Sequence, residues 1–123
     1  MNKMNNKFMV LAVPDYLTHH ERKALINVLQ IAKETISNNY GVQLVNESTA
    51  IGLDYGFYKK KDFKEKEEDA QVTLFIDFGH SKLSAYAIKF TQKYQKVILQ
   101  HHRRQLGCRD MDALMYQFYS GIF

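Results

Sequence analysis

The first part of the chain shows an apolar run followed by a helical pattern. Residues 8–13 (FMVLAV) are continuously apolar. Such a run predicts a buried strand in a parallel sheet that is covered on both faces. Thr18 and Glu21 have the spacing of a capping box, which predicts that a helix begins here. One face of this helix repeats apolar residues at helical spacing: Leu25, Leu29, Ala32 and Ile36.

A second strand and a second helix are predicted next. Gly41 is expected to end the first helix in the left-handed conformation. Residues 42–45 predict a short strand, and residues 46–49 open a shorter helix that extends to about Tyr58. The order strand, helix, strand, helix indicates an α/β layer with parallel pairing.

The pattern changes after a highly charged segment. Residues 59–69 (KKKDFKEKEED) contain five Lys, five acids and one apolar residue, Phe63, which predicts a mobile surface connection. Residues 72–77, 83–90 and 96–101 then predict three strands of an antiparallel meander. A last helix follows, with apolar residues on one face: Met111, Leu114, Met115 and Phe118.

Composition narrows the class of protein. The chain has 123 residues, 46% of them apolar and 24% charged, which is typical of one soluble domain at most. A net charge of +4 is too small to indicate nucleic-acid binding. No apolar stretch reaches membrane-spanning length. Cys108 is alone, so no internal disulfide is expected, and a cytoplasmic protein is the expectation.

The segment FIDFGHSK (residues 75–82) carries the most suggestive chemistry. Asp77 at a strand end can hold Mg²⁺, directly or through water. Gly79 allows a sharp turn and a close approach to a ligand, and exposed amides of such a turn can cradle phosphate. An ordinary hairpin turn explains Asp and Gly equally well. The Asp-Phe-Gly triplet also occurs in protein kinases, but the chain lacks their G-x-G-x-x-G and His-Arg-Asp motifs.

Other polar residues are less specific. Glu47 lies where a strand gives way to a helix, and it could orient water or a metal. Alternatively, it is simply an acid in the first helical turn, where the helix dipole favours negative charge. Lys82 could contact a phosphate or point to solvent. The histidines occur without Cys partners or i,i+4 spacing, which argues against a zinc site.

The order of the motifs is more specific than any one of them. It resembles the ATPase domain of the seventy-kilodalton heat-shock chaperones, within the actin-like ATPase superfamily. The resemblance covers residues 10–118 and is carried by five segments: VPDY (13–16), NESTA (46–50), DYG (54–56), FIDFG (75–79) and LG (106–107). The sequence Gly79-His80-Ser81 is most similar to the large, hundred-and-ten-kilodalton branch.

The resemblance implies an α/β, ribonuclease H-like fold segment with a mixed sheet and flanking helices, formed from parts of two lobes. Residues 1–58 would end the first lobe, residues 59–70 would form the charged connection, and residues 71–123 would begin the second lobe. The implied ligand is ATP or ADP with Mg²⁺.

The resemblance also implies roles for individual residues. Asp77 would act on the Mg²⁺ and its waters, and Glu47 would organise water and metal as the second catalytic carboxylate. The amides of Gly79, His80 and Ser81 would approach the β- and γ-phosphates, with Lys82 beside them. The ribose would lie near two further residues of the site, Gly107 and Cys108.

Several residues depart from the family pattern. Lys82 stands where the family has a Thr that handles the γ-phosphate, Cys108 replaces a Gly, and Ser48 replaces a Pro. The family's first phosphate loop, catalytic Lys and adenine-binding segment lie outside this sequence. Because phosphoryl transfer needs several groups positioned together, we expect this partial domain to be inactive alone, although the parent family has weak ATPase activity.

The implied function is that of an ATP-binding molecular chaperone of the large heat-shock branch. Such a protein acts in the stress response as a nucleotide-exchange partner and holdase. Its partners would be smaller heat-shock chaperones and unfolded clients, without nucleic acid or membrane. The alternative is a non-catalytic protein-binding module, or a truncated product that does not bind nucleotide.

Overall fold

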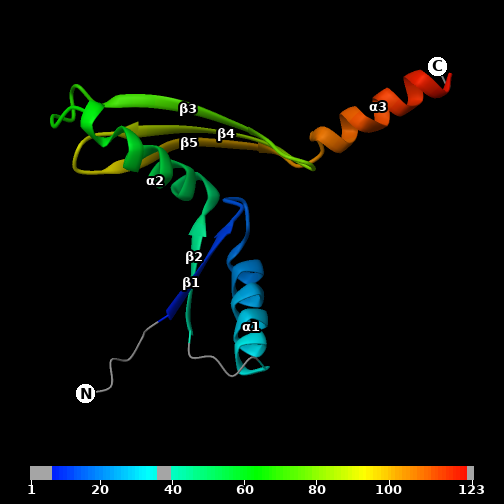
Figure 1. The fold of residues 1–123 in the computed structure, drawn as a ribbon, viewed down its shortest axis with the longest axis horizontal. Helices are drawn as coiled ribbons and strands as arrows, with labels where there is room; N and C mark the ends of the chain where they lie inside the picture. Colours follow the sequence, from blue (N-terminus) through cyan, green and yellow to red (C-terminus); the bar gives the residue numbers. More distant parts are fainter. Residues whose placement is uncertain (1–6, 36–39, 122–123) are drawn as a thin grey trace. The chain divides into compact units, whose positions relative to one another are not determined.

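The computed structural model describes residues 7–35 and 40–121, which form two compact units divided within one helix, between Ile51 and Gly52. The first unit contains β1 (Lys7–Val13), α1 (His19–Thr35), β2 (Tyr40–Asn46) and the start of α2 (Glu47–Lys59). The second contains the rest of α2, a short 3-10 turn (Lys60–Asp62), β3 (Gln71–Phe78), β4 (Leu83–Phe90), β5 (Gln95–Arg103) and α3 (Cys108–Ser120). The elements are labelled in Figure 1.

The first unit is a β–α–β arrangement with parallel pairing, as the sequence predicts. Strands β1 and β2 pair in register from Lys7 opposite Tyr40 to Val13 opposite Asn46. Helix α1 begins with the predicted capping box. The Thr18 amide donates to Glu21 Oε2 at 2.7 Å, and the Glu21 amide donates to Thr18 Oγ1 at 3.3 Å.

The prediction that β1 is covered on both faces is wrong for the described chain. Val13 is buried, but Phe8 and Val10 on the other face are 63% and 60% exposed. The reason is that α1 is the one described helix of this unit that packs on the strand pair, and it covers one face. On that helix Leu25 and Leu29 are half-buried as expected.

The prediction for Gly41 is also wrong. Gly41 lies inside β2 rather than at a left-handed helix end. Its partner across the strand pair is Phe8, and a Cβ atom on Gly41 would come within 2.6 Å of the Phe8 ring. Glycine therefore makes room for an aromatic ring here. Ile36, expected on the apolar face of α1, lies outside the described residues.

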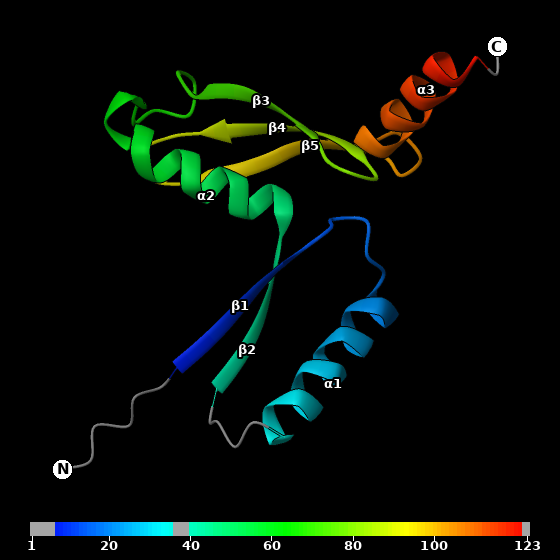
Figure 2. The ribbon, with the colours of Figure 1, turned by 45° about the vertical axis from the view of Figure 1, so that its right-hand side comes forward.

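The second unit is the predicted antiparallel meander with a helix on one face. The order is β3–β4–β5, with a β-bulge between Ala87 and Ile88. Both views show α2 lying along this sheet (Figures 1 and 2). The contact is aromatic, because the Tyr55 ring of α2 lies 5.2 Å from Phe75 and 5.4 Å from Phe90 between centroids.

The core of this unit comes mainly from β4. Its side chains alternate, and Tyr86, Ile88 and Phe90 are almost completely buried. The opposite face of the sheet is exposed, as is the apolar side of α3, whose described residues include none that is buried.

The charged connection is anchored rather than wholly on the surface. Phe63, its one apolar residue, is 3% exposed and stacks on Phe90 with a centroid distance of 5.0 Å. The Gln92 side-chain amide donates to the Phe63 carbonyl at 2.9 Å. The expectation of a mobile segment therefore needs correction at Phe63, because hydrophobic burial fixes the chain at this point.

Candidate functional site: the turn between β3 and β4

The turn that follows Asp77 is tight. The Gly79 amide donates to the Lys82 carbonyl at 2.9 Å, which closes residues 79–82 between the two strands. Asp77 lies on β3 opposite Ser84 and is half-buried on the inner face of the sheet. Gly79 does not adopt the left-handed conformation, and a Cβ atom on it would meet the Lys82 carbonyl oxygen at an ordinary 3.6 Å.

Two of the three expected amide donors remain available in this turn. The Gly79 amide is occupied by its bond to Lys82, so Gly79 cannot also donate to a ligand without opening the turn. Among the described residues, the His80 and Ser81 amides have no hydrogen bond, and both residues are exposed. Unpaired amides at an exposed turn can bind an anion.

The structure brings Gly107 and Cys108 to this same turn. The Cys108 amide donates to the Gly79 carbonyl at 3.0 Å, and the Arg109 amide donates to the His80 carbonyl at 3.1 Å. A Cβ atom on Gly107 would come within 2.6 Å of the His80 carbonyl carbon and 2.7 Å of the Ser81 nitrogen. Glycine is therefore required by this close backbone approach.

Residues 79–82 and 107–108 form one corner of the second unit, and local contacts fix its remaining groups. The Gly107 amide donates to Asp110 Oδ2 at 2.7 Å, which caps the start of α3. The exposed Cys108 thiol lies 3.7 Å from the Phe78 carbonyl oxygen. Six of the eight residues expected in the site thus lie around one corner of the second unit: Gly79, His80, Ser81, Lys82, Gly107 and Cys108.

Glu47 belongs to the first unit, where it is the first residue of α2. Beside it, the Ser48 amide donates to Asp15 Oδ2 at 3.1 Å, and the Ser48 hydroxyl donates to Asp15 Oδ1. The carboxylate of Asp15 therefore caps α2 from a distant part of the chain. Ser48 is 1% exposed, so this hydrogen bonding satisfies a buried hydroxyl.

Sequence reasoning missed Asp15 and Arg22 as organising residues. The Arg22 side chain donates from Nε to the Leu17 carbonyl at 2.9 Å and from its terminal nitrogen to the Pro14 and Asp15 carbonyls at 3.3 Å. These bonds hold the loop that presents Asp15 to α2. An acid after Pro14 together with a Ser at the start of a helix was the signal available in the sequence.

Within residues 7–35 and 40–121, no group of three or more His, Cys, Asp or Glu side chains could hold a metal ion. If Asp77 acted on Mg²⁺, the other ligands would therefore be mainly water or phosphate oxygens. The helices of the same described residues lack the combined length and hydrophobicity of a membrane-spanning segment.

Comparisons with known proteins identify the family of the chain. The family model "Hsp70 protein" matches residues 2–123, and the chain belongs to this family. It is 32% identical to the 97 kDa heat shock protein of Strongylocentrotus purpuratus and to heat shock protein 110 of Caenorhabditis elegans, over 93% of this chain in each case. It is 31% identical to heat shock 70 kDa protein 4 of Rattus norvegicus over the same share.

The chain spans 12 to 14% of the length of these relatives. The fold is thus a mixed α/β segment with parallel and antiparallel strand pairs, consistent with part of the actin-like ATPase domain of the heat-shock chaperone family.

Proposed function

We propose that the corner formed by residues 79–82 and 107–108 receives phosphate groups of ATP or ADP, as part of the nucleotide-binding domain of a large heat-shock chaperone. The observation that carries this proposal is the direct backbone contact between the two segments, beside which the His80 and Ser81 amides make no hydrogen bond among the described residues. Family membership supports nucleotide as the source of the phosphate.

The residues present fit such a ligand. The His80 and Ser81 amides and the Ser81 hydroxyl can donate to phosphate oxygens, and the Lys82 ammonium can compensate their charge. Asp77 would orient Mg²⁺ through water, and Glu47 of the first unit would organise water. The bound nucleotide would supply the phosphoryl group. Gly79 contributes by closing the turn.

The lobe assignment belongs to the same proposal. Residues 1–58 would end the first lobe, residues 59–70 would connect, and residues 71–123 would begin the second lobe. The parallel pair β1–β2 and the antiparallel sheet β3–β4–β5 support this because they form separate sheets. For the whole protein, we infer a cytoplasmic chaperone that holds unfolded clients and promotes nucleotide exchange on smaller heat-shock chaperones.

Nuclear magnetic resonance of the backbone amides tests the nucleotide proposal. Titration of the full chain with Mg-ATP should shift His80 and Ser81 first, with millimolar affinity, because the other half of the phosphate clamp is outside this sequence. Asp77→Asn should weaken the amide shifts that Mg²⁺ adds to those of ATP. The shifts caused by ATP without metal should stay largely unchanged. Asp62→Asn, in the exposed connection, is the matched control. Saturating Mg-ATP that leaves residues 79–82 unshifted would overturn the proposal.

A second candidate is a protein-binding module that acts without nucleotide. It is favoured by the exposed apolar residues of the outer sheet face and by Lys82, which stands where the family has Thr. Purification of the chain with a stoichiometric protein, unaffected by ATP, would support this candidate. A chain that purifies alone and binds Mg-ATP would exclude it.

A further inference from the structure

The second unit contains an apolar cavity at the end of β4 opposite the candidate phosphate site. The turn at residues 79–82 precedes β4, whereas the cavity lies at the turn that follows β4, residues 91–94. The volume is about 260 Å³. Cavities for drug-sized ligands range from about 300 to 1,000 Å³, so this one suits a single large side chain better than a nucleotide.

The floor of the cavity is rigid and aromatic. Phe63 and Phe90 form it, and both are almost completely buried and stacked with 14° between their planes. The walls carry apolar side chains that stay exposed, Leu53 at 57% and Phe57 at 80%. A preformed aromatic floor with exposed apolar walls favours an apolar or aromatic group from another molecule.

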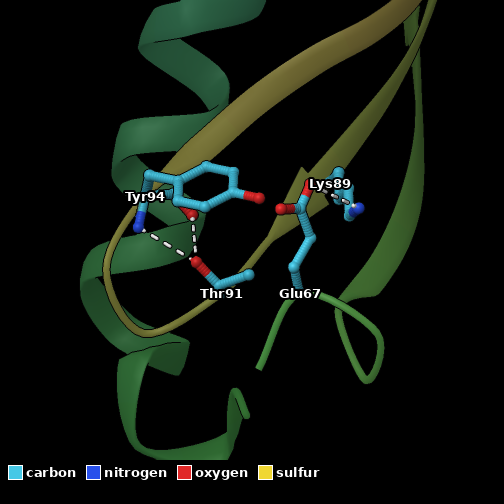
Figure 3. Close-up of polar contacts among 4 residues, drawn as sticks. All are labelled: Glu67, Lys89, Thr91 and Tyr94. Atoms are coloured by element: carbon cyan, nitrogen blue, oxygen red, sulfur yellow. Dashed lines mark hydrogen bonds and ion pairs between the residues drawn. The ribbon is translucent and has the colours of Figure 1, made fainter. Parts of the chain in front are cut away.

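The far wall is the turn between β4 and β5, which is held in place by two sets of contacts (Figure 3). The Thr91 hydroxyl donates to the Tyr94 carbonyl at 3.1 Å and accepts from the Tyr94 amide at 3.1 Å. Outside the turn, Lys89 Nζ donates to the Glu67 carboxylate at 3.2 Å, and the Tyr94 hydroxyl faces the same carboxylate. The wall is therefore preorganised, which lowers the entropy lost on binding.

The charged residues that line the cavity have one sign. Lys60 and Lys93 are the charged residues that line it, and both are exposed. Two acids of the nearby connection are paired elsewhere, because Asp62 contacts Lys59 at 3.5 Å and Glu67 contacts Lys89 at 3.2 Å. An occupant with carboxylates beside its apolar group would complement the two lysines.

We propose that this cavity binds an acidic peptide segment, inserting one aromatic or large aliphatic side chain between Phe57 and Tyr94 while flanking carboxylates contact Lys60 and Lys93. The site is independent of the candidate nucleotide site, which lies at the other end of β4.

The test uses the full chain and three synthetic peptides. The first has a central Phe between Glu residues, the second replaces Phe with Ala, and the third replaces the Glu residues with Lys. Amide resonances of Gly56 and of residues 91–95 should shift with the first peptide. The Ala peptide should bind about tenfold or more weakly, because the buried ring is lost. The Lys peptide should bind about threefold to tenfold more weakly than the first.

Two sets of variants locate the site. Lys60→Glu with Lys93→Glu should weaken the Glu peptide about threefold to tenfold and strengthen the Lys peptide. Lys66→Glu is the matched control, since this exposed lysine of the same connection does not line the cavity. Gly56→Leu should block the cavity. Gly56→Ala should not, because its Cβ atom would lie at an ordinary 3.6 Å from the Phe90 ring.

The lysine variants keep the proposal testable if Gly56→Leu does not fold, because both lysines are exposed. Any of three results would overturn the proposal. The Phe and Ala peptides could bind equally well, the Lys60→Glu and Lys93→Glu pair could have the same effect as Lys66→Glu, or residues 91–95 could show no shift. Loss of Mg-ATP binding with retained peptide binding would affect the nucleotide proposal only.

Discussion

Gly107 and His80 are in direct backbone contact, since a Cβ atom on Gly107 would come within 2.6 Å of the His80 carbonyl carbon. Gly107→Ala should therefore force α3 and the turn apart. We expect a loss of about 1–3 kcal/mol in the free energy of unfolding, as for overpacking elsewhere. Urea unfolding monitored by circular dichroism measures it.

Gly79→Ala is the matched control for Gly107→Ala. A Cβ atom on Gly79 would make an ordinary 3.6 Å contact, so this variant should differ little from the unsubstituted chain in stability. If both variants are equally stable, the close approach of Gly107 to the turn is not present in solution.

A second prediction concerns the pair Asp15 and Ser48. Ser48→Ala should lower the free energy of unfolding by about 1–3 kcal/mol, because it leaves the Asp15 carboxylate with fewer donors in a part-buried place. Asp15→Ala should cost a similar amount, since it removes the cap of α2 and leaves the buried Ser48 hydroxyl unsatisfied.

The double variant distinguishes a shared interaction from two separate effects. If Asp15 and Ser48 act together, the double variant should lose clearly less than the sum of the single losses. Strict additivity in urea unfolding would contradict a direct interaction between these residues.

A third prediction concerns pH. The Tyr94 hydroxyl, which donates a hydrogen bond, lowers the pKa of Glu67 below its ordinary 4.5, and Lys89 lowers it further. A depressed carboxyl pKa contributes stability that is present above the unfolded value and is lost as pH falls through the folded value. The turn between β4 and β5 should therefore loosen in acid below about pH 4.5, as the Glu67 carboxylate takes up a proton.

Titration of the Glu67 side chain by nuclear magnetic resonance checks this prediction. Tyr94→Phe should raise the Glu67 pKa toward its ordinary value, and Lys89→Met should raise it as well, because Lys89 both bonds the carboxylate and attracts its charge. Lys66→Met serves as a charge control. A Glu67 pKa that ignores Tyr94→Phe would mean that the hydroxyl does not reach the carboxylate.

The sequence predicted the elements well where short-range chemistry decides them. Thr18 and Glu21 marked the start of α1, because a capping box depends on residues three positions apart. The alternation along residues 83–90 likewise predicted β4, whose inner face is buried at every second residue.

The sequence did not reveal contacts that depend on distant residues. Gly41 has the usual features of a helix end, but it lies in a strand opposite Phe8, whose ring leaves no room for a Cβ atom. Phe63 stands in a run of charges, so composition indicated a surface segment, yet Phe90 buries it. Likewise, Asp15 and Ser48 are far apart in sequence, and only the fold makes their hydrogen bonds visible.

The last prediction concerns the outer face of the β3–β4–β5 sheet. Leu74 and Ile76 on β3 are 62% and 69% exposed, and Leu99 on β5 is 65% exposed. Contiguous exposed apolar residues on a sheet favour association between molecules, especially beside an edge strand such as β3. The average mass of the isolated chain in sedimentation should therefore rise with concentration. Leu74→Lys should reduce that rise by placing a charge within the face, whereas Gln117→Lys, which adds the same charge on α3, should reduce it less. An equal reduction by both variants would assign the effect to net charge rather than to this face.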